Sequence, residues 1–209
     1  MAPPTANLSA RTKILKSALS VIRAKGYAAT SVDDLCSGAG VTKGAFFHHF
    51  KSKEDLAVAA ADFWAVTTGE FFAGAPYHVH SDPLDRVLGY LDMRKAMLIG
   101  AVPDFTCLAG TMVQEAYGSN PMIRAACERA ICEHAEKIEA DVAAAIEMHR
   151  IEAQWTAASL ALHMQGVLQG AFILAKAKGD AQVAADCIDH LRRYVELLFS
   201  RPTNQEEAA

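Results

Sequence analysis

Side chains that can bond to a phosphate or to a DNA base are concentrated in one short stretch, residues 31–53. Lys43 can reach O6 or N7 of guanine, or a phosphate oxygen. The hydroxyls of Ser31 and Thr42 can donate to phosphates, beside helix N-terminal amides that also attract anions. The methyl group of Ala45 can contact the methyl group of thymine. These residue types point to the chemistry of DNA recognition.

A helix-turn-helix would present these side chains on one surface. Ser31 begins a short helix that ends at residues 38–40, with Asp34 as the partner in a capping box. Gly40 can take the left-handed backbone conformation that a tight turn requires. A second helix then runs from Thr42 to about residue 49, and we expect it to enter the major groove, with Lys53 at the start of the following helix anchoring the DNA backbone. The residues predicted to face DNA are Ser31, Thr42, Lys43, Ala45, Phe47, His48, His49 and Lys53.

The overall charge of −4 argues against DNA binding, but the charge is unevenly distributed. Residues 1–56 carry eight Lys and Arg residues against four acids, a net charge of +4, which leaves −8 on the rest of the chain. A basic head on an acidic body is typical of a protein in which only the head touches phosphate.

Helical periodicity dominates the whole chain, and no strand or hairpin pattern stands out. Caps, prolines and glycines divide the sequence, so the predicted fold is all-α with about nine helices. The first helix covers residues 10–25. Beyond the helix-turn-helix, helices are predicted at about 52–72, 82–100, 103–117, 120–150, 154–178 and 180–200, with a loop at 74–80.

The segment from Arg11 to Leu56 resembles the N-terminal domain of the TetR family of transcriptional repressors, and the likeness continues more loosely beyond it. The resemblance implies a helix-turn-helix domain at residues 1–52 and a ligand-binding and dimerisation domain at 53–209. It also implies a cytoplasmic homodimer that binds palindromic operator DNA and is released by a small-molecule effector.

One position departs from the family pattern. The recognition helix of the family often carries tyrosines that donate to phosphate, whereas Phe47 has no hydroxyl. His48 and His49 can compensate, and His49 is frequent at this position in the family. Two other interpretations stay open: a plain helical hairpin with a solvated basic face, or an adaptor module that has kept this fold and lost DNA reading.

Two helices near the C-terminus have the pattern of a dimer interface. Small residues at a spacing of four along residues 158–174 allow another helix to approach closely, and residues 184–198 carry an apolar stripe at helical spacing. The alternative is that these faces pack within one chain. The predicted interface residues are Leu162, Gly166, Gly170, Leu174, Ile188, Leu191 and Val195.

Aromatic and thioether side chains gather between residues 93 and 122, where they can line an adaptable apolar pocket or simply fill the core. Cys107 is predicted to lie in the first turn of the helix at 103–117, and a helix N-terminus stabilises a thiolate. It is therefore either an electrophile sensor, as the resemblance implies for some relatives, or a small buried side chain. The predicted effector-contacting residues are Met93, Met97, Phe105, Cys107, Met112 and Tyr117.

Other classes of function have little support. No Ser-His-Asp order, glycine-rich phosphate loop or paired carboxylates indicate an enzyme, and no spacing of His and Cys indicates a metal site or a cofactor. The five cysteines lack Cys-x-x-Cys pairs, which is typical of reduced thiols. Residues 153–175 contain no charged side chain, but Gln154, His163 and Gln165 interrupt them, so we expect a helix buried in protein and not in a membrane.

Overall fold

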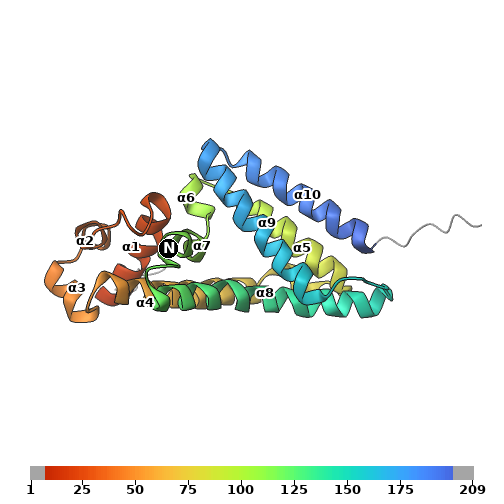
Figure 1. The fold of residues 1–209 in the computed structure, drawn as a ribbon, viewed down its shortest axis with the longest axis horizontal. Coiled ribbons are helices and arrows are strands. Elements are labelled where there is room, and N and C mark those ends of the chain that lie inside the picture. Colours follow the sequence, from red (N-terminus) through yellow and green to blue (C-terminus); the bar gives the residue numbers. More distant parts are fainter. Residues whose placement is uncertain (1–7, 200–209) are drawn as a thin grey trace, which may run out of the picture. The chain divides into compact units, whose positions relative to one another are not determined.

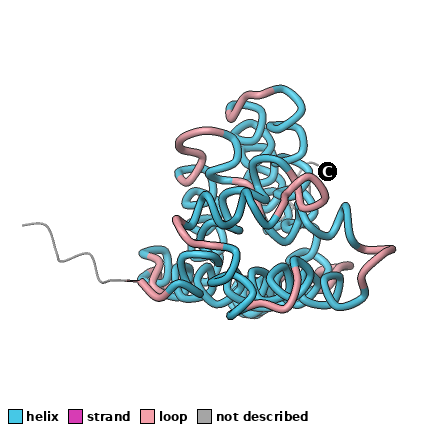
Figure 2. The backbone as a smooth tube through the Cα atoms, turned by 90° about the vertical axis from the view of Figure 1, so that its left-hand side faces the viewer, coloured by secondary structure: helices cyan, strands magenta, loops and turns pink. Residues whose placement is uncertain are grey.

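The computed structural model describes residues 8–199, and every regular element within that range is a helix (Figures 1 and 2). There are ten α-helices and one short 3₁₀ helix in the described residues. Their bounds are α1 (Ala10–Lys25), α2 (Val32–Ala39), α3 (Lys43–His49), α4 (Lys53–Ala73), η1 (Pro76–Val79), α5 (Pro83–Ala96), α6 (Val102–Phe105), α7 (Leu108–Ala116), α8 (Pro121–His149), α9 (Ala157–Lys178) and α10 (Gln182–Phe199).

The all-α prediction is confirmed, and the tenth helix comes from a break in the element predicted at 103–117. The backbone is extended at Thr106 (ψ 157°) and at Cys107 (ψ 127°), so α6 ends there and α7 begins anew. Each piece has its own cap: Asp104 accepts from the backbone N–H of Ala101 at 2.9 Å, and the Cys107 sulfur accepts from Gly110 at 3.3 Å. The predicted loop at 74–80 also contains η1.

The chain divides into two compact units, Met1–Ala73 with Gly100–His134, and Gly74–Ile99 with Ala135–Ala209. The division falls inside α8, which contributes residues to both units. The first unit contains α4, α6 and α7 as well as the three N-terminal helices. The predicted domain boundary after residue 52 separates a DNA-binding domain from an effector-binding domain. It does not coincide with this division into compact units, and it stays a prediction.

The first unit is built around one apolar core. Helix α1 buries Ile14, Leu15 and Ile22, and α3 buries Phe46, as its helical spacing predicts. The same core includes side chains of α7 and of the first half of α8, so these helices and the three N-terminal helices share one hydrophobic cluster. Its other fully buried members include Leu35, Leu56, Leu108, Met112 and Ile123.

The second unit packs α10 against α9 and α5 (Figure 1). The buried Gln165 of α9 donates to the hydroxyl oxygen of Tyr90 in α5 at 3.1 Å, which satisfies a polar group inside the apolar interior. Ion pairs at the rim join α5 to α10, with Lys95 2.7 Å from Asp189. The uncharged stretch of α9 is thus a helix with one face packed in protein.

The contact between α1 and α2 depends on a glycine. Ser17 is buried and its hydroxyl donates to the carbonyl oxygen of Leu35 at 2.9 Å. A Cβ atom at Gly38 would lie 2.4 Å from the Ser17 oxygen, which is too close for both groups to keep their positions. Position 38 therefore has to be glycine although it lies in a helix, where alanine is otherwise favoured.

We expect Gly38→Ala to destabilise the protein by about 1–3 kcal/mol, because the Ser17 hydroxyl must move and its buried hydrogen bond is lost. In a Ser17→Ala background the same substitution should become neutral or stabilising, by up to about 1 kcal/mol. Urea unfolding of the two single variants and the double variant measures both values. Gly44→Ala is the control, since its nearest neighbour would be 3.7 Å away. Additive effects at Ser17 and Gly38 would contradict the contact.

Candidate nucleic-acid interface

Helices α2 and α3 form the predicted helix-turn-helix. Gly40 ends α2 in the left-handed conformation (φ 63°, ψ 40°), so the chain reverses without straining a Cβ atom. The hydroxyl oxygen of Thr42 accepts from the backbone N–H of Ala45 at 3.2 Å and fixes the start of α3. Its buried residue Phe46 anchors α3 to the core. The helix is thus held by its inner face and by its N-cap.

The outer face of α3 is free of core packing. Thr42, Lys43 and His48 are exposed, and Phe47 has 56% of its surface accessible. Ala45 and His49 are half-buried. The outer face of α3 thus leaves the side chains of Thr42, Lys43, Phe47 and His48 accessible to a binding partner.

Lys43 of α3 forms an ion pair with Asp33 of α2. Its Nζ lies 2.9 Å from Asp33 Oδ1 of α2, and the hydrogen bond to this carboxylate raises the pKa of Lys43. Both side chains are well exposed, so the pair is weak and readily exchanged. Because the pair is weak, Lys43 can leave Asp33 for a phosphate or a guanine edge.

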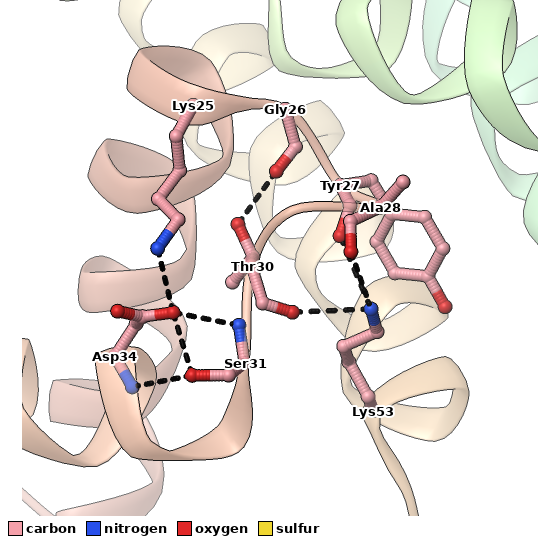
Figure 3. Close-up of polar contacts among 8 residues, drawn as sticks. All are labelled: Lys25, Gly26, Tyr27, Ala28, Thr30, Ser31, Asp34 and Lys53. Atoms are coloured by element: carbon pink, nitrogen blue, oxygen red, sulfur yellow. Dashed lines mark hydrogen bonds and ion pairs between the residues drawn. The ribbon is translucent and has the colours of Figure 1, made fainter.

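Ser31 uses its hydroxyl for capping. Its oxygen accepts from the N–H of Asp34 at 3.2 Å, and its proton goes to the Asp34 carboxylate at 2.6 Å (Figure 3). Hydrogen bonds from Lys25 and Ser31 lower the pKa of Asp34, so the carboxylate stays charged. Ser31 thus presents a well-ordered helix N-terminus, and its hydroxyl has to break a bond before it can donate to DNA.

Lys53 has different surroundings from those predicted. Its ammonium donates to the carbonyl oxygens of Tyr27, Ala28 and Thr30 at 3.2, 3.4 and 3.1 Å (Figure 3). It also lies 4.5 Å from the centre of the Tyr27 ring, and burial of that ring, with the nearby Glu54, raises the pKa of Tyr27 to about 12. The primary role that this geometry supports is to fix the α1–α2 loop, and a DNA contact by Lys53 stays a prediction.

Arg11 is a candidate that the sequence analysis missed. It is exposed in the first turn of α1, and its guanidinium stacks on the Phe50 ring at 5.4 Å from the centre. Phe50 ends α3, so the stack brings a cation from α1 to the end of the recognition helix. Only its charge was visible in the sequence, because no local spacing connects residues 11 and 50.

The predicted effector-contacting residues do not form one set. Met112 is fully buried in the core, whereas Tyr117 has 67% of its surface exposed, and contact of either with an effector stays a prediction. Phe105 and Cys107 are half-buried in the first unit, and Met93 and Met97 belong to the other unit. Cys107 is the N-cap of α7 and does not lie within the first turn of a longer helix.

The predicted dimer residues also separate into two groups. Ile188, Leu191 and Val195 are buried against the rest of their own chain, and a role for them in a dimer stays a prediction. The line on α9 is different: Leu162, Gly166 and Leu174 are exposed, and Gly170 is half-buried. On α10 the exposed apolar side chains are Tyr194 and Leu197, which lie between the buried positions of the stripe.

Two family models match the chain. The model of bacterial regulatory proteins of the tetR family matches residues 14–60, and that of the tetracyclin repressor-like C-terminal domain matches residues 83–191, just over half of the chain. The chain belongs to the TetR family. It is therefore a transcriptional regulator with a helix-turn-helix, and proteins of this family are DNA-binding regulators and not enzymes.

Individual relatives support this assignment. The HTH-type transcriptional regulator YerO of Bacillus subtilis is 39% identical over 54 residues, which cover 26% of this chain and 19% of YerO. The HTH-type transcriptional repressor KstR2 of Mycolicibacterium smegmatis is 40% identical over 58 residues, 27% of this chain and 28% of that repressor. The matches therefore span less than a third of the curated relatives.

The likeness in structure covers more of the chain. A TetR transcriptional regulator from Chloroflexus aurantiacus is 28% identical, with a TM-score of 0.76 over 90% of this chain and 94% of that one.

Two helices of the present chain, α4 and α9, have the length and apolar composition of a membrane span, but core helices of globular proteins commonly have the same length and composition.

We expect Lys53→Met to destabilise the regulator by about 1–3 kcal/mol, because three backbone carbonyls lose a charged donor. Lys51→Met should stay within about 0.5 kcal/mol of the wild type, since Lys51 is exposed. Thermal and urea unfolding compare the two variants. Equal stabilities would show that the Lys53 contacts contribute nothing to the fold.

Proposed function

We propose that this TetR-family regulator is a ligand-responsive repressor that binds palindromic operator DNA as a homodimer in the cytoplasm. The observation that carries the proposal is the free outer face of α3, with Thr42, Lys43, Phe47 and His48 exposed. This face lies on the part of the chain with a net positive charge, which suits contact with phosphate.

Roles follow from the chemistry of each side chain. Lys43 exchanges Asp33 for a guanine edge or a phosphate, and the Ala45 methyl meets a thymine methyl. His48 and His49 donate to phosphate oxygens in place of the hydroxyl that Phe47 lacks. The N-terminus of α2 at Ser31 offers backbone amides to a second phosphate. Arg11 adds a cation at the end of α3.

The proposed dimer interface is the exposed face of α9 and α10. It carries Leu162, Ile173 and Leu174 on α9, with Tyr194 and Leu197 on α10, each exposed by 44% or more. Five exposed apolar side chains on two packed helices are a candidate interface. Two identical heads related by a two-fold axis would read the two halves of a palindrome.

The proposed effector is a small hydrophobic or electrophilic molecule. Cys107 is the candidate thiol for the electrophilic case, because it is half-buried at the start of α7 and its sulfur already accepts a backbone N–H from Gly110. A molecule releases DNA only if it binds the DNA-incompetent state more tightly than the competent one. Phe105, in the same compact unit, is the apolar side chain proposed to contact the molecule.

Lys43→Ala should bind operator DNA about tenfold more weakly or worse, because a specific contact from α3 is lost. The probe is a duplex selected from a random pool by the wild-type protein, and affinity is measured by fluorescence anisotropy at fixed salt. Lys137→Ala, an exposed lysine of α8, is the control and should bind normally. Unchanged affinity of Lys43→Ala would remove Lys43 from the interface, and failure to enrich any duplex would refute the repressor proposal.

Gly170→Leu tests the dimer at a position where the single chain leaves room for a Cβ atom. That atom would have no neighbour within 4 Å, and urea unfolding of the variant shows whether the larger side chain disturbs the single chain. We expect sedimentation velocity to show monomers, or a dimer at least about tenfold weaker, because the close approach of two helices is blocked. Ala143→Leu, exposed on α8, is the matched control. An unchanged dimer of Gly170→Leu would move the interface elsewhere.

A further inference from the structure

The two carboxylates in the first turn of α2 have different partners. Asp34 accepts from the backbone N–H and the hydroxyl of Ser31, at 2.7 and 2.6 Å, and lies 2.7 Å from the ammonium of Lys25 (Figure 3). Asp33, the residue before it, lies instead 2.9 Å from the ammonium of Lys43 in α3. Asp34 thus caps its own helix, while the carboxylate of Asp33 reaches the helix predicted to enter the major groove.

The other acids of the N-terminal helices also bond to their own surroundings. Asp55 accepts from the backbone N–H of Lys51 at 2.9 Å. Glu54 is held at the start of α4, where hydrogen bonds from its own backbone N–H and from the Ser52 hydroxyl lower its pKa. Of the four acids in residues 8–56, Asp33 is the one that forms an ion pair with a side chain of the outer face of α3.

An acid at this place is unfavourable for DNA binding unless DNA gives it a partner. Its carboxylate repels the phosphates that the positive charge of residues 1–56 attracts. An acid in the first turn stabilises a helix through the helix dipole, which accounts for an acid on α2 but not for its pairing with Lys43. When Lys43 turns to DNA, Asp33 loses its partner, and the exchange is balanced only if DNA offers the carboxylate a donor.

The major-groove edge of a G·C base pair offers the matching groups. Guanine presents two acceptors, N7 and O6, and the N4 amino group of the paired cytosine lies beside O6 as a donor. An ammonium and a carboxylate side by side therefore meet acceptors and a donor side by side. In an A·T pair the N6 amino group lies between two acceptors, N7 of adenine and O4 of thymine, so one acceptor is left facing the carboxylate.

We propose that Asp33 and Lys43 read one G·C base pair together. Lys43 Nζ donates to O6 or N7 of the guanine, and the Asp33 carboxylate accepts from N4 of the paired cytosine. Each charge exchanges one partner for another, so neither is left unpaired in the complex. Asp33 is thus a specificity-determining residue of α2. The proposal rests on the proposed repressor function, because it needs a specific operator.

A duplex that lacks only the cytosine amino group tests this reading. The duplex is selected from a random pool by the wild-type protein, and the G·C pair read by Lys43 is the one whose replacement by A·T no longer weakens binding of Lys43→Ala. Its cytosine is then replaced by 2-pyrimidinone, which has a hydrogen atom in place of the N4 amino group. Fluorescence anisotropy at fixed salt should show about tenfold weaker binding of the wild type to the altered duplex, because the carboxylate loses its donor.

The variant Asp33→Ala separates the base contact from the weaker base pair that 2-pyrimidinone forms. The Asp33 side chain is 70% exposed, so its removal leaves the core unchanged. The variant should lose most of the discrimination between the two duplexes, and it should bind duplexes without the selected site more tightly than the wild type does. Glu128→Ala, which removes an exposed acid of α8, is the matched control and should discriminate as the wild type does.

The possible results distinguish the joint reading from the repressor function. Equal discrimination by the wild type and Asp33→Ala overturns the reading by Asp33 and leaves the repressor function intact. A selected duplex in which no G·C pair responds to Lys43→Ala does the same. If Asp33→Ala changes the affinity for every duplex by one factor, Asp33 only repels phosphate and the proposal is wrong. If the wild type selects no duplex, the repressor function fails and the joint reading fails with it.

Discussion

The structure of the DNA-binding part depends on the need to satisfy the backbone of the α1–α2 loop while leaving α3 free. Buried peptide groups need hydrogen-bond partners, and a short loop between two helices has few of its own. Here Lys53 and Glu115 supply them from α4 and α7. Because these partners come from outside the three N-terminal helices, none of the side chains on the outer face of α3 is needed to hold the loop.

This constraint explains why the first compact unit extends beyond the helix-turn-helix. Three short helices of 16, 8 and 7 residues bury little surface by themselves. Packing Leu108, Met112 and Ile123 into the same core adds apolar area that they lack. Because the core is completed by these later helices, α3 needs only Phe46 for its packing and its outer residues, such as the exposed Phe47, take no part in the core.

Local structure could be predicted from the sequence because its signals lie within a few residues of each other. The cap at Thr42, the left-handed Gly40 and the buried Phe46 follow from residue type and helical spacing. Long-range contacts could not be predicted. Glu115 and Tyr27 are 88 residues apart, and nothing in either segment marks the other. The break at Thr106 was missed for a related reason, since the cap that begins α7 is a cysteine, a residue type without a strong N-cap preference.

The dimer residues show the limit of periodicity most clearly. An apolar stripe indicates that a helix face is covered, but it does not say whether the chain itself or a second copy covers it. On α10 the stripe through Ile188 and Val195 is covered by the chain. On α9 two apolar faces exist: Leu168 and Ala175 face the interior, while Leu162 and Leu174 stay exposed. A helix that is apolar on both sides has an inner face that its own fold covers and an outer face that it leaves exposed, and sequence periodicity alone cannot tell one from the other.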